Sequence, residues 1–160
     1  MRKTLVAYFS TSGVTERVAK VLADEAKADL YSIRPAEPYT EADLNWQDKN
    51  SRSSKEMRDK DSRPVLADKH ANIQDYDTVF LGFPIWWYVA PTIINTFLES
   101  YDFSGKTIIL FATSGGSGFG ETVQALKRSV DSSAVIREGR VFSGRVNEAS
   151  IREWISKTVI

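Results

Sequence analysis

A cluster of hydroxyl side chains near the N-terminus is the first feature that could do chemistry. Four hydroxyls and one glycine fall within six residues, between an apolar run and a helical pattern: Ser10, Thr11, Ser12, Gly13, Val14 and Thr15. The first amides of a helix have no partners within it, and with the helix dipole they attract phosphate. Hydroxyls add hydrogen bonds, and Gly13 allows close approach of the backbone. An ordinary cap by Thr11 or Ser12 needs one hydroxyl only, so this hydroxyl loop (residues 10–15) favours a phosphate site.

A second unusual segment, the aromatic loop (residues 84–91), holds three consecutive aromatic residues between two prolines. It reads Pro84, Ile85, Trp86, Trp87, Tyr88, Val89, Ala90 and Pro91. Three rings that directly follow a buried strand cannot all point inward. At least one is therefore expected at the surface, where it can stack on a planar group. Packing of the rings over the end of a sheet, or against a partner subunit, agrees equally well with this sequence.

A third segment, the glycine loop (residues 113–118), is made of small residues: Thr113, Ser114, Gly115, Gly116, Ser117 and Gly118. Backbone groups there can approach a ligand closely and hydrogen-bond a polar ring edge. A flexible turn with positive φ angles would look the same. The glycine loop indicates a ligand site only if it lies beside the other two loops.

Two nucleotide-binding motifs are incomplete in this chain. Gly105–Thr107 resembles the end of a Walker A loop, but Ser100 stands where its first glycine belongs. The glycine turn Gly116–Gly120 is one residue shorter than the dinucleotide fingerprint, and Glu121 replaces the last glycine. Binding of a nucleoside triphosphate or a dinucleotide through these motifs is therefore not expected.

The composition excludes several kinds of chemistry. Cysteine is absent, and His70, the single histidine, lies in a charged stretch and is expected at the surface. No acidic and histidine residues have metal-ligand spacing. The 21 basic and 21 acidic residues cancel, which gives no field toward nucleic acid or an anionic membrane. No apolar run approaches the roughly 20 residues that span a bilayer, so a cytoplasmic protein is expected.

The three loops must be positioned by strands that alternate with helices. Short apolar runs predict strands at Leu5–Phe9, Asp29–Arg34, Thr78–Phe83, Thr107–Ala112 and near Ala134–Ile136. Helical spacing follows each of the loops, and Asn147 can cap a last helix with Ile151, Trp154, Ile155 and Val159 inside. This alternation predicts an α/β fold, a single domain over residues 1–160 with a parallel sheet and helices on both faces. All three loops then lie at one sheet edge, where ligands of such folds bind.

Two stretches are predicted with less regular structure. Residues 41–70 hold seven acidic and seven basic residues and read as a solvated helix plus loop. Thr40–Asp43 has the pattern of a capping box ahead of it, and Pro64 marks a break. After the short fifth strand, an irregular stretch is expected up to Gly144.

Taken together, residues 8–15, 82–87 and 111–118 resemble the flavodoxin family, and most of all its bacterial branch with Pro-Ile-Trp-Trp and Thr-Ser-Gly-Gly-Ser-Gly loops. Pro38–Thr40 and Ser51–Arg52 are similar to that branch as well. The resemblance implies a five-stranded parallel sheet in the order 2-1-3-4-5 with non-covalent FMN. By position, Ser10 to Thr15 would hold the phosphate, Pro84 to Tyr88 would form a wall of the ring site, and Thr113 to Gly118 would contact the polar ring edge.

The resemblance implies an FMN electron carrier without catalytic side chains. Two departures stand out: Val14 replaces the asparagine of many flavodoxins, and the chain lacks their strongly acidic surface. An NAD(P)H-dependent FMN-containing quinone reductase on the same fold is the alternative, and a flavin-free signalling module is a third, weaker reading. The expected partner is a redox protein or a small planar acceptor such as a quinone. The oligomeric state stays open.

Overall fold

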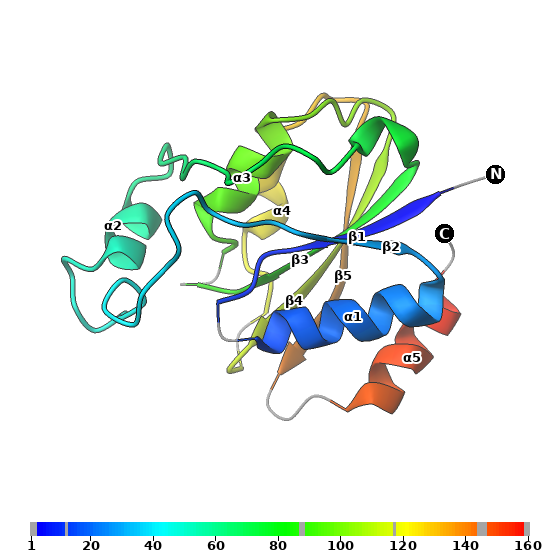
Figure 1. Cartoon of the computed structure of the whole chain (residues 1–160), viewed down its shortest axis with the longest axis horizontal. Helices are drawn as coiled ribbons and strands as arrows, with labels where there is room; N and C mark the ends of the chain where they lie inside the picture. The colour runs from blue at the N-terminus through cyan, green and yellow to red at the C-terminus, as the bar shows by residue number, and fades with distance from the viewer. Residues whose placement is uncertain (1–2, 12, 87–88, 117, 144–146, 159–160) are drawn as a thin grey trace.

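The computed structural model describes residues 3–11, 13–86, 89–116, 118–143 and 147–158, and these contain one five-stranded parallel sheet (Figure 1). In the sheet, the strands lie in the order β2-β1-β3-β4-β5. They are β1 (Thr4–Tyr8), β2 (Asp29–Ser32), β3 (Thr78–Pro84), β4 (Thr107–Ser114) and β5 (Val135–Ser143). The predicted fold class and the strand order implied by the family resemblance are confirmed.

Helices cover both faces of this sheet. The described helices are α1 (Val14–Ala26), α2 (Arg52–Arg58), α3 (Thr92–Glu99), α4 (Thr122–Lys127) and α5 (Glu148–Lys157), with a 3₁₀ turn at Ile73–Asp75. Helices α1 and α5 lie on one face and α3 and α4 on the other, whereas α2 lies out beyond the end of the sheet (Figure 1). None of these helices is long and apolar enough to cross a membrane.

Alternate residues of each strand enter two separate cores. In β1, Val6 and Tyr8 pack in the core under α1 and α5, while Leu5 and Ala7 pack in the core under α3 and α4. Both sets are nearly inaccessible to solvent. Burial on both faces explains why the inner strands appear in the sequence as continuous apolar runs.

The charged stretch, residues 41–70, contains a helix and loops as predicted. Its helix is short and begins only at Arg52. Thr40 and Asp43 exchange the two hydrogen bonds of a capping box, at 3.0 and 3.1 Å between backbone amides and side-chain oxygens. These bonds close a turn, not a helix. Helix α2 begins only after Ser51, whose side chain accepts from the Ser54 amide. A capping pattern alone cannot carry a helix when no apolar stripe follows it.

Strand β5 was predicted wrongly as a short strand followed by an irregular stretch. It runs over Val135–Ser143. As an edge strand it is half exposed and bears Arg137, Glu138 and Arg140, so it has no continuous apolar run. A bulge at Gly139 also breaks its alternation, because Leu110 pairs with Glu138 but Phe111 with Arg140. A Cβ at Gly139 would lie 2.2 Å from the Leu110 carbonyl oxygen.

Other helix and strand boundaries differ slightly from the predicted ones. Strand β2 ends at Ser32, ahead of the predicted Arg34, and Pro91 is the N-cap of α3 and not its first residue. Strands β3 and β4 extend by pairing of Pro84 with Thr113, which makes the start of two predicted loops part of the sheet. The prediction for Val159 falls outside the described residues.

Candidate functional site

Thr113 fastens the three predicted loops to one another at the carboxyl edge of the sheet. Its Oγ1 lies 2.7 Å from Oγ1 of Thr15 in a buried contact. Its carbonyl accepts a hydrogen bond of 2.9 Å from the Ile85 amide. Because Thr113 is the first residue of the glycine loop, this one residue joins it to the hydroxyl loop and to the aromatic loop. The predicted convergence of the three loops is confirmed for their described residues.

Among the described residues, no side chain caps the first turn of α1. Gly13 is the N-cap, with a left-handed φ of 89°, and makes no side-chain cap hydrogen bond. Ser10 accepts through Oγ from the Gly13 amide at 3.1 Å, so it shapes the loop ahead of the helix. A Cβ at Gly13 would meet nothing within 4 Å. The cap by Thr11 is therefore wrong, and Ser12 lies outside the described residues.

The acidic residue in the first turn of α1 is paired. Glu16 accepts a hydrogen bond from the Tyr8 hydroxyl at 3.3 Å, and Lys20 lies 3.3 Å from the same carboxylate oxygen. Val14 is 43% exposed, and its side chain has no polar atom. Val14 can therefore bind an anion through its backbone amide only.

The aromatic loop closes as a tight turn. The amide and carbonyl of Trp86 bond those of Val89 in both directions, at 3.0 and 3.1 Å. Trp87 and Tyr88 lie outside the described residues, so the expected exposed ring stays a prediction. Pro84, Ile85 and Trp86 are each half-buried. Trp86 forms a wall on the side of β1, where it meets Phe9 edge-on at 5.9 Å between ring centroids.

Tyr39 completes this wall and was not among the predicted site residues. Its ring contacts Trp86 and Phe9 edge-on, at 5.6 and 5.7 Å between centroids. The Arg52 guanidinium lies over it at 3.9 Å, and Glu56 accepts from its hydroxyl. Burial, with that hydrogen bond next, raises the pKa of the Tyr39 phenol well above its usual range. In the sequence, Pro38–Thr40 resembles the same family branch, but that resemblance did not indicate a role for Tyr39.

The glycine loop presents bare backbone. Gly115, Gly116 and Gly118 are exposed, and a Cβ on any of them would meet nothing within 4 Å. Gly116 has a φ of 149°, and its amide donates to Ser114 Oγ at 3.0 Å. Ser117 lies outside the described residues. The predicted open backbone is confirmed for the three glycines, whereas Thr113 is buried and Ser114 is half-buried.

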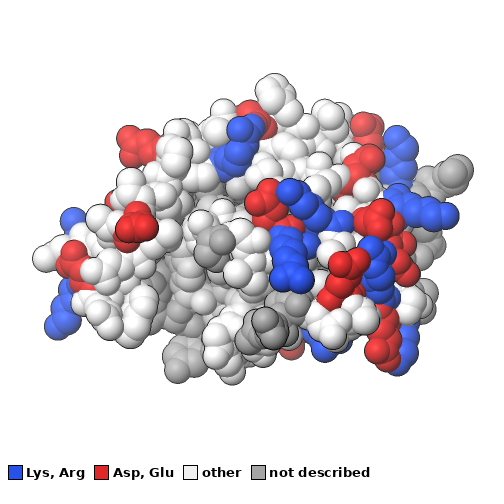
Figure 2. All heavy atoms as spheres, turned by 60° about the horizontal axis from the view of Figure 1, so that its bottom comes forward, with Lys and Arg blue, Asp and Glu red and all other residues white. Residues whose placement is uncertain are grey.

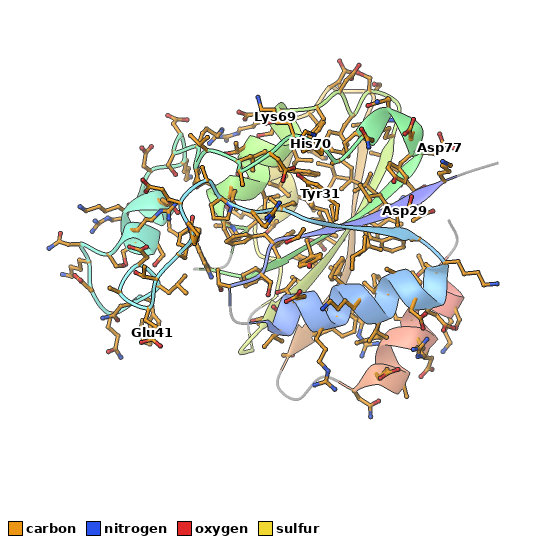
Figure 3. All side chains as sticks on the ribbon, in the orientation of Figure 1. Asp29, Tyr31, Glu41, Lys69, His70 and Asp77 are labelled. Atoms are coloured by element: carbon orange, nitrogen blue, oxygen red, sulfur yellow. The ribbon has the colours of Figure 1, made fainter. Side chains whose placement is uncertain are left out.

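Charged side chains gather away from these loops. Figure 2 shows a dense group of both signs over α1 and α5, and few charged side chains among the described residues between that group and α2. In that group, Arg152 pairs with Asp24, Glu25 and Glu148 at 2.8 to 3.1 Å. His70 is exposed, as predicted, and the described residues contain no cluster of metal ligands. In Figure 3, Asp29 and Asp77 lie at the opposite end of the sheet from Glu41.

A parallel sheet in this order, with an uncapped helix start, an aromatic wall and a bare glycine loop at one edge, defines a flavodoxin-like α/β protein. The flavodoxin family model matches residues 3–158, and the chain therefore belongs to the flavodoxin family.

Solved structures agree with this membership. A candidate flavoprotein from Bacteroides uniformis is 48% identical, covers 98% of this chain and 99% of its own, and superposes with a TM-score of 0.91. A second from Bacteroides eggerthii is 49% identical over 98% and 97%, with a TM-score of 0.88. A flavoprotein from Lactobacillus acidophilus, solved in complex with FMN, shares the fold at 19% identity over 96% and 99%, with a TM-score of 0.68. A search of curated protein sequences gave no match.

Proposed function

We propose that this chain binds FMN non-covalently and transfers electrons between a redox partner and an acceptor. The observation that carries the proposal is the junction at Thr113, which holds the three loops together by one buried hydroxyl contact and one backbone bond. A preformed site of this kind loses little entropy when a ligand enters. Membership of the flavodoxin family and the FMN in the Lactobacillus relative support the same ligand.

The hydroxyl loop fits the phosphate of FMN. Uncapped first-turn amides and the positive end of the α1 dipole favour an anion. Ser10, Thr11 and Thr15 can add hydroxyl donors, and the space over Gly13 lets an oxygen reach the backbone. Val14 can take part through its amide alone.

The other two loops fit the ring. The Trp86 wall offers an aromatic surface, steadied by Tyr39 and Phe9. The glycines of the glycine loop are exposed and have open space where a Cβ would stand, so the polar ring edge can come close to their backbone. FMN supplies the redox chemistry when it is bound. The chain's own residues bind it, orient it and limit the access of water, and no side chain need act as acid or base.

A second candidate is an NAD(P)H-dependent FMN-containing quinone reductase on this fold. Its support is the aromatic loop, since residues 84–91 contain no charged residue, while Figure 2 shows the densest charges over α1 and α5. Such a surface suits a small planar apolar acceptor better than the docking of a basic protein. The carrier is preferred because the loops contain no motif for a nicotinamide nucleotide.

Two measurements test these proposals. Titration of flavin-free protein with FMN, followed by flavin fluorescence quenching, should show one saturable site; a lack of binding would reject both. Steady NAD(P)H oxidation by FMN-loaded protein with a quinone, at roughly 1 per second or more, would identify the reductase. Rapid exchange of electrons with a redox protein, without such turnover, would identify the carrier.

A further inference from the structure

Helix α2 carries the ion pair that is most shielded from water in the described part of the chain. Arg52 Nε donates to Glu56 Oε2 at 3.1 Å, and the two side chains are only 23% and 14% exposed. In every other ion pair of the described residues, at least one partner is more than a third exposed. Removal of two charges from water costs free energy that their attraction often fails to offset. The stability of one short helix therefore does not account for this pair.

The pair holds the ring of Tyr39 at two places. The Arg52 guanidinium lies over the ring face, 3.9 Å from the centroid, and the Glu56 carboxylate accepts from the phenol hydroxyl. Arg52 is itself fixed by a hydrogen bond of 2.8 Å from Nη1 to the Glu37 carbonyl. A cation over an aromatic face is attracted to it, and more strongly when water is excluded. The Tyr39 ring can thus neither tilt nor slide without the loss of one of these contacts.

The segment that carries the pair, the insert (residues 37–64), is closed at its base by the chain itself. The Ala36 amide donates to the Val65 carbonyl at 2.7 Å, and the Ala67 amide to the Arg34 carbonyl at 2.8 Å. These bonds form a short antiparallel pairing of residues 34–36 with residues 65–67. The insert therefore leaves and rejoins the body of the protein at one fixed place.

The far side of the insert is fastened to α3, the helix that follows the aromatic loop. The Ser62 Oγ donates to the Glu56 carbonyl at 3.0 Å and lies 2.8 Å from Oγ1 of Thr92, the first residue of α3. The next residue, Arg63, donates to both carboxylate oxygens of Glu99 at 2.9 and 3.0 Å. The backbone that bears Glu56 is thus tied to the element directly after the aromatic loop.

One aromatic ring separates the ion pair from the proposed flavin wall. Tyr39 contacts Trp86 edge-on at 5.6 Å between ring centroids, and Arg52 lies on the same Tyr39 ring. Little water screens charges that are shielded in this way, so their fields reach further than those of exposed side chains. Each charge is therefore placed to act on a group bound against Trp86, and together the two charges largely cancel.

We propose that Arg52 and Glu56 position the Trp86 wall through Tyr39, and that their cancelling charges keep the reduction potential of bound FMN from shifting either way. The inference rests on the proposed function, because Trp86 belongs to the proposed FMN site. Both are positioning residues, since they act through Tyr39. Electrons added to a flavin bring negative charge, which an unbalanced cation nearby favours and an unbalanced anion disfavours.

The test compares wild type with Arg52→Gln, Glu56→Gln and the variant that carries both changes. Flavin-free protein is titrated with FMN by fluorescence quenching, and the midpoint potential of each loaded protein is measured by spectroelectrochemistry. Each single variant should weaken FMN about 10-fold, because Tyr39 loses one of its two holds.

The potentials should shift in opposite directions. Arg52→Gln leaves the Glu56 carboxylate unbalanced and should lower the potential, whereas Glu56→Gln leaves the guanidinium unbalanced and should raise it. The double variant should return to the wild-type potential while its FMN affinity stays low. This pattern separates the effect of charge from the effect of position, which a loss of structure alone would not do.

Two kinds of control accompany these variants. Arg52→Lys keeps the charge and should keep the wild-type potential, so it tests the direction of the shift even if Arg52→Gln does not fold. Lys157→Gln and Glu153→Gln break an exposed pair of the same spacing on α5, at 2.8 Å, and should change neither potential nor FMN affinity. Urea unfolding of each flavin-free protein shows which variants are folded.

Potential shifts of the same sign in the two single variants, or no shift in either, would overturn the proposal. Unchanged FMN affinity in both would overturn it as well. A wild type that does not bind FMN would reject the proposed function and this inference with it. Binding by the wild type, together with any of the contrary results in the variants, would reject this inference alone.

Discussion

Helices α1 and α5 lie side by side on one face of the sheet (Figure 1). Their N-terminal ends are capped differently. At α5, the side chain of Asn147 accepts a hydrogen bond of 2.7 Å from the Ala149 amide. At α1, Gly13 is the N-cap and no side chain of the part of the chain that the structure describes caps the helix, although hydroxyl residues precede it in the sequence.

The difference separates a helix start built for stability from one kept open for a ligand. A side-chain cap stabilises a helix by about 1 kcal/mol. Helix α1 forgoes that contribution, and Ser10 turns its oxygen to the Gly13 amide instead. The start of α1 is also joined to Thr113 through Thr15, whereas among the described residues no hydrogen bond joins Asn147 to the three loops. Changes at α1 should therefore alter FMN affinity, and changes at α5 should alter stability alone.

The largest effect is expected for Gly13→Ala. The new Cβ would sit in the space where a phosphate approaches, and a φ of 89° is strained for alanine. We expect the FMN dissociation constant to rise roughly 100-fold, a loss of about 2.7 kcal/mol. Gly105→Ala is the matched control, because Gly105 has a φ of 73° and equally open space. If both variants bind FMN like the wild type, the open helix start does not serve the phosphate.

Thr15→Val should lower both the free energy of unfolding and the affinity for FMN, with a smaller effect on FMN affinity than Gly13→Ala. Valine keeps the shape but leaves the buried Thr113 hydroxyl without its partner at 2.7 Å. The free energy of unfolding, measured with urea, should fall by about 1–3 kcal/mol, and FMN affinity should fall because the junction loosens. Thr15→Ser, which keeps a hydroxyl, should recover most of both losses. Unchanged stability in Thr15→Val would show that the contact is not what joins the loops.

Asn147→Ala is the counterpart at α5. Loss of the cap should lower the free energy of unfolding by about 1 kcal/mol. FMN affinity should stay at the wild-type value, and Asn147→Asp should restore the stability. A change of FMN affinity in Asn147→Ala without a change in Asn147→Asp would contradict the contrast between the two helices.

The smallest effect concerns the end of the sheet away from the loops. Burial and the hydrogen bond to Asp29 raise the pKa of Tyr76 to about 12, above the ordinary value near 10. The neutral phenol is thus favoured by the folded state, so its stabilisation is complete below pH 10 and is lost as the pH rises toward 12. Tyr76→Phe should show a shallower decline of unfolding free energy over that interval, with FMN affinity unchanged at pH 7. An identical slope in both proteins would show that Tyr76 does not titrate as described.

The fold and the three loops could be predicted because their signals are local. Strands buried on both faces appear as apolar runs, such as Thr78–Phe83, and the carboxyl ends of parallel strands share one edge. Position along the chain then places the hydroxyl, aromatic and glycine loops together. Strand β5 was predicted too short for the opposite reason, since Gly139 and its charged neighbours remove both the apolar run and the alternation beyond Ile136.

Tyr39 and Arg52 could not be assigned to a site from the sequence. Both belong to the part of the chain that leaves the sheet after β2 and returns at β3. Its path is set by single long-range contacts, such as Arg52 over Tyr39 and the Ser62 hydroxyl 2.8 Å from that of Thr92. Contacts of this kind have no period, so no pattern in the sequence predicts them.

The pairing of residues 34–36 with residues 65–67 has a consequence for how copies of this chain behave when crowded. Directly after β2, the backbone groups of residues 34–36 that could pair with a foreign strand are already taken by the chain itself. At the other edge, β5 carries Arg137, Glu138 and Arg140 around a bulge, which opposes edge-to-edge pairing. Both features oppose growth into larger aggregates. The open backbone that the molecule retains lies at the end of the strands, where a small ligand fits and another sheet does not.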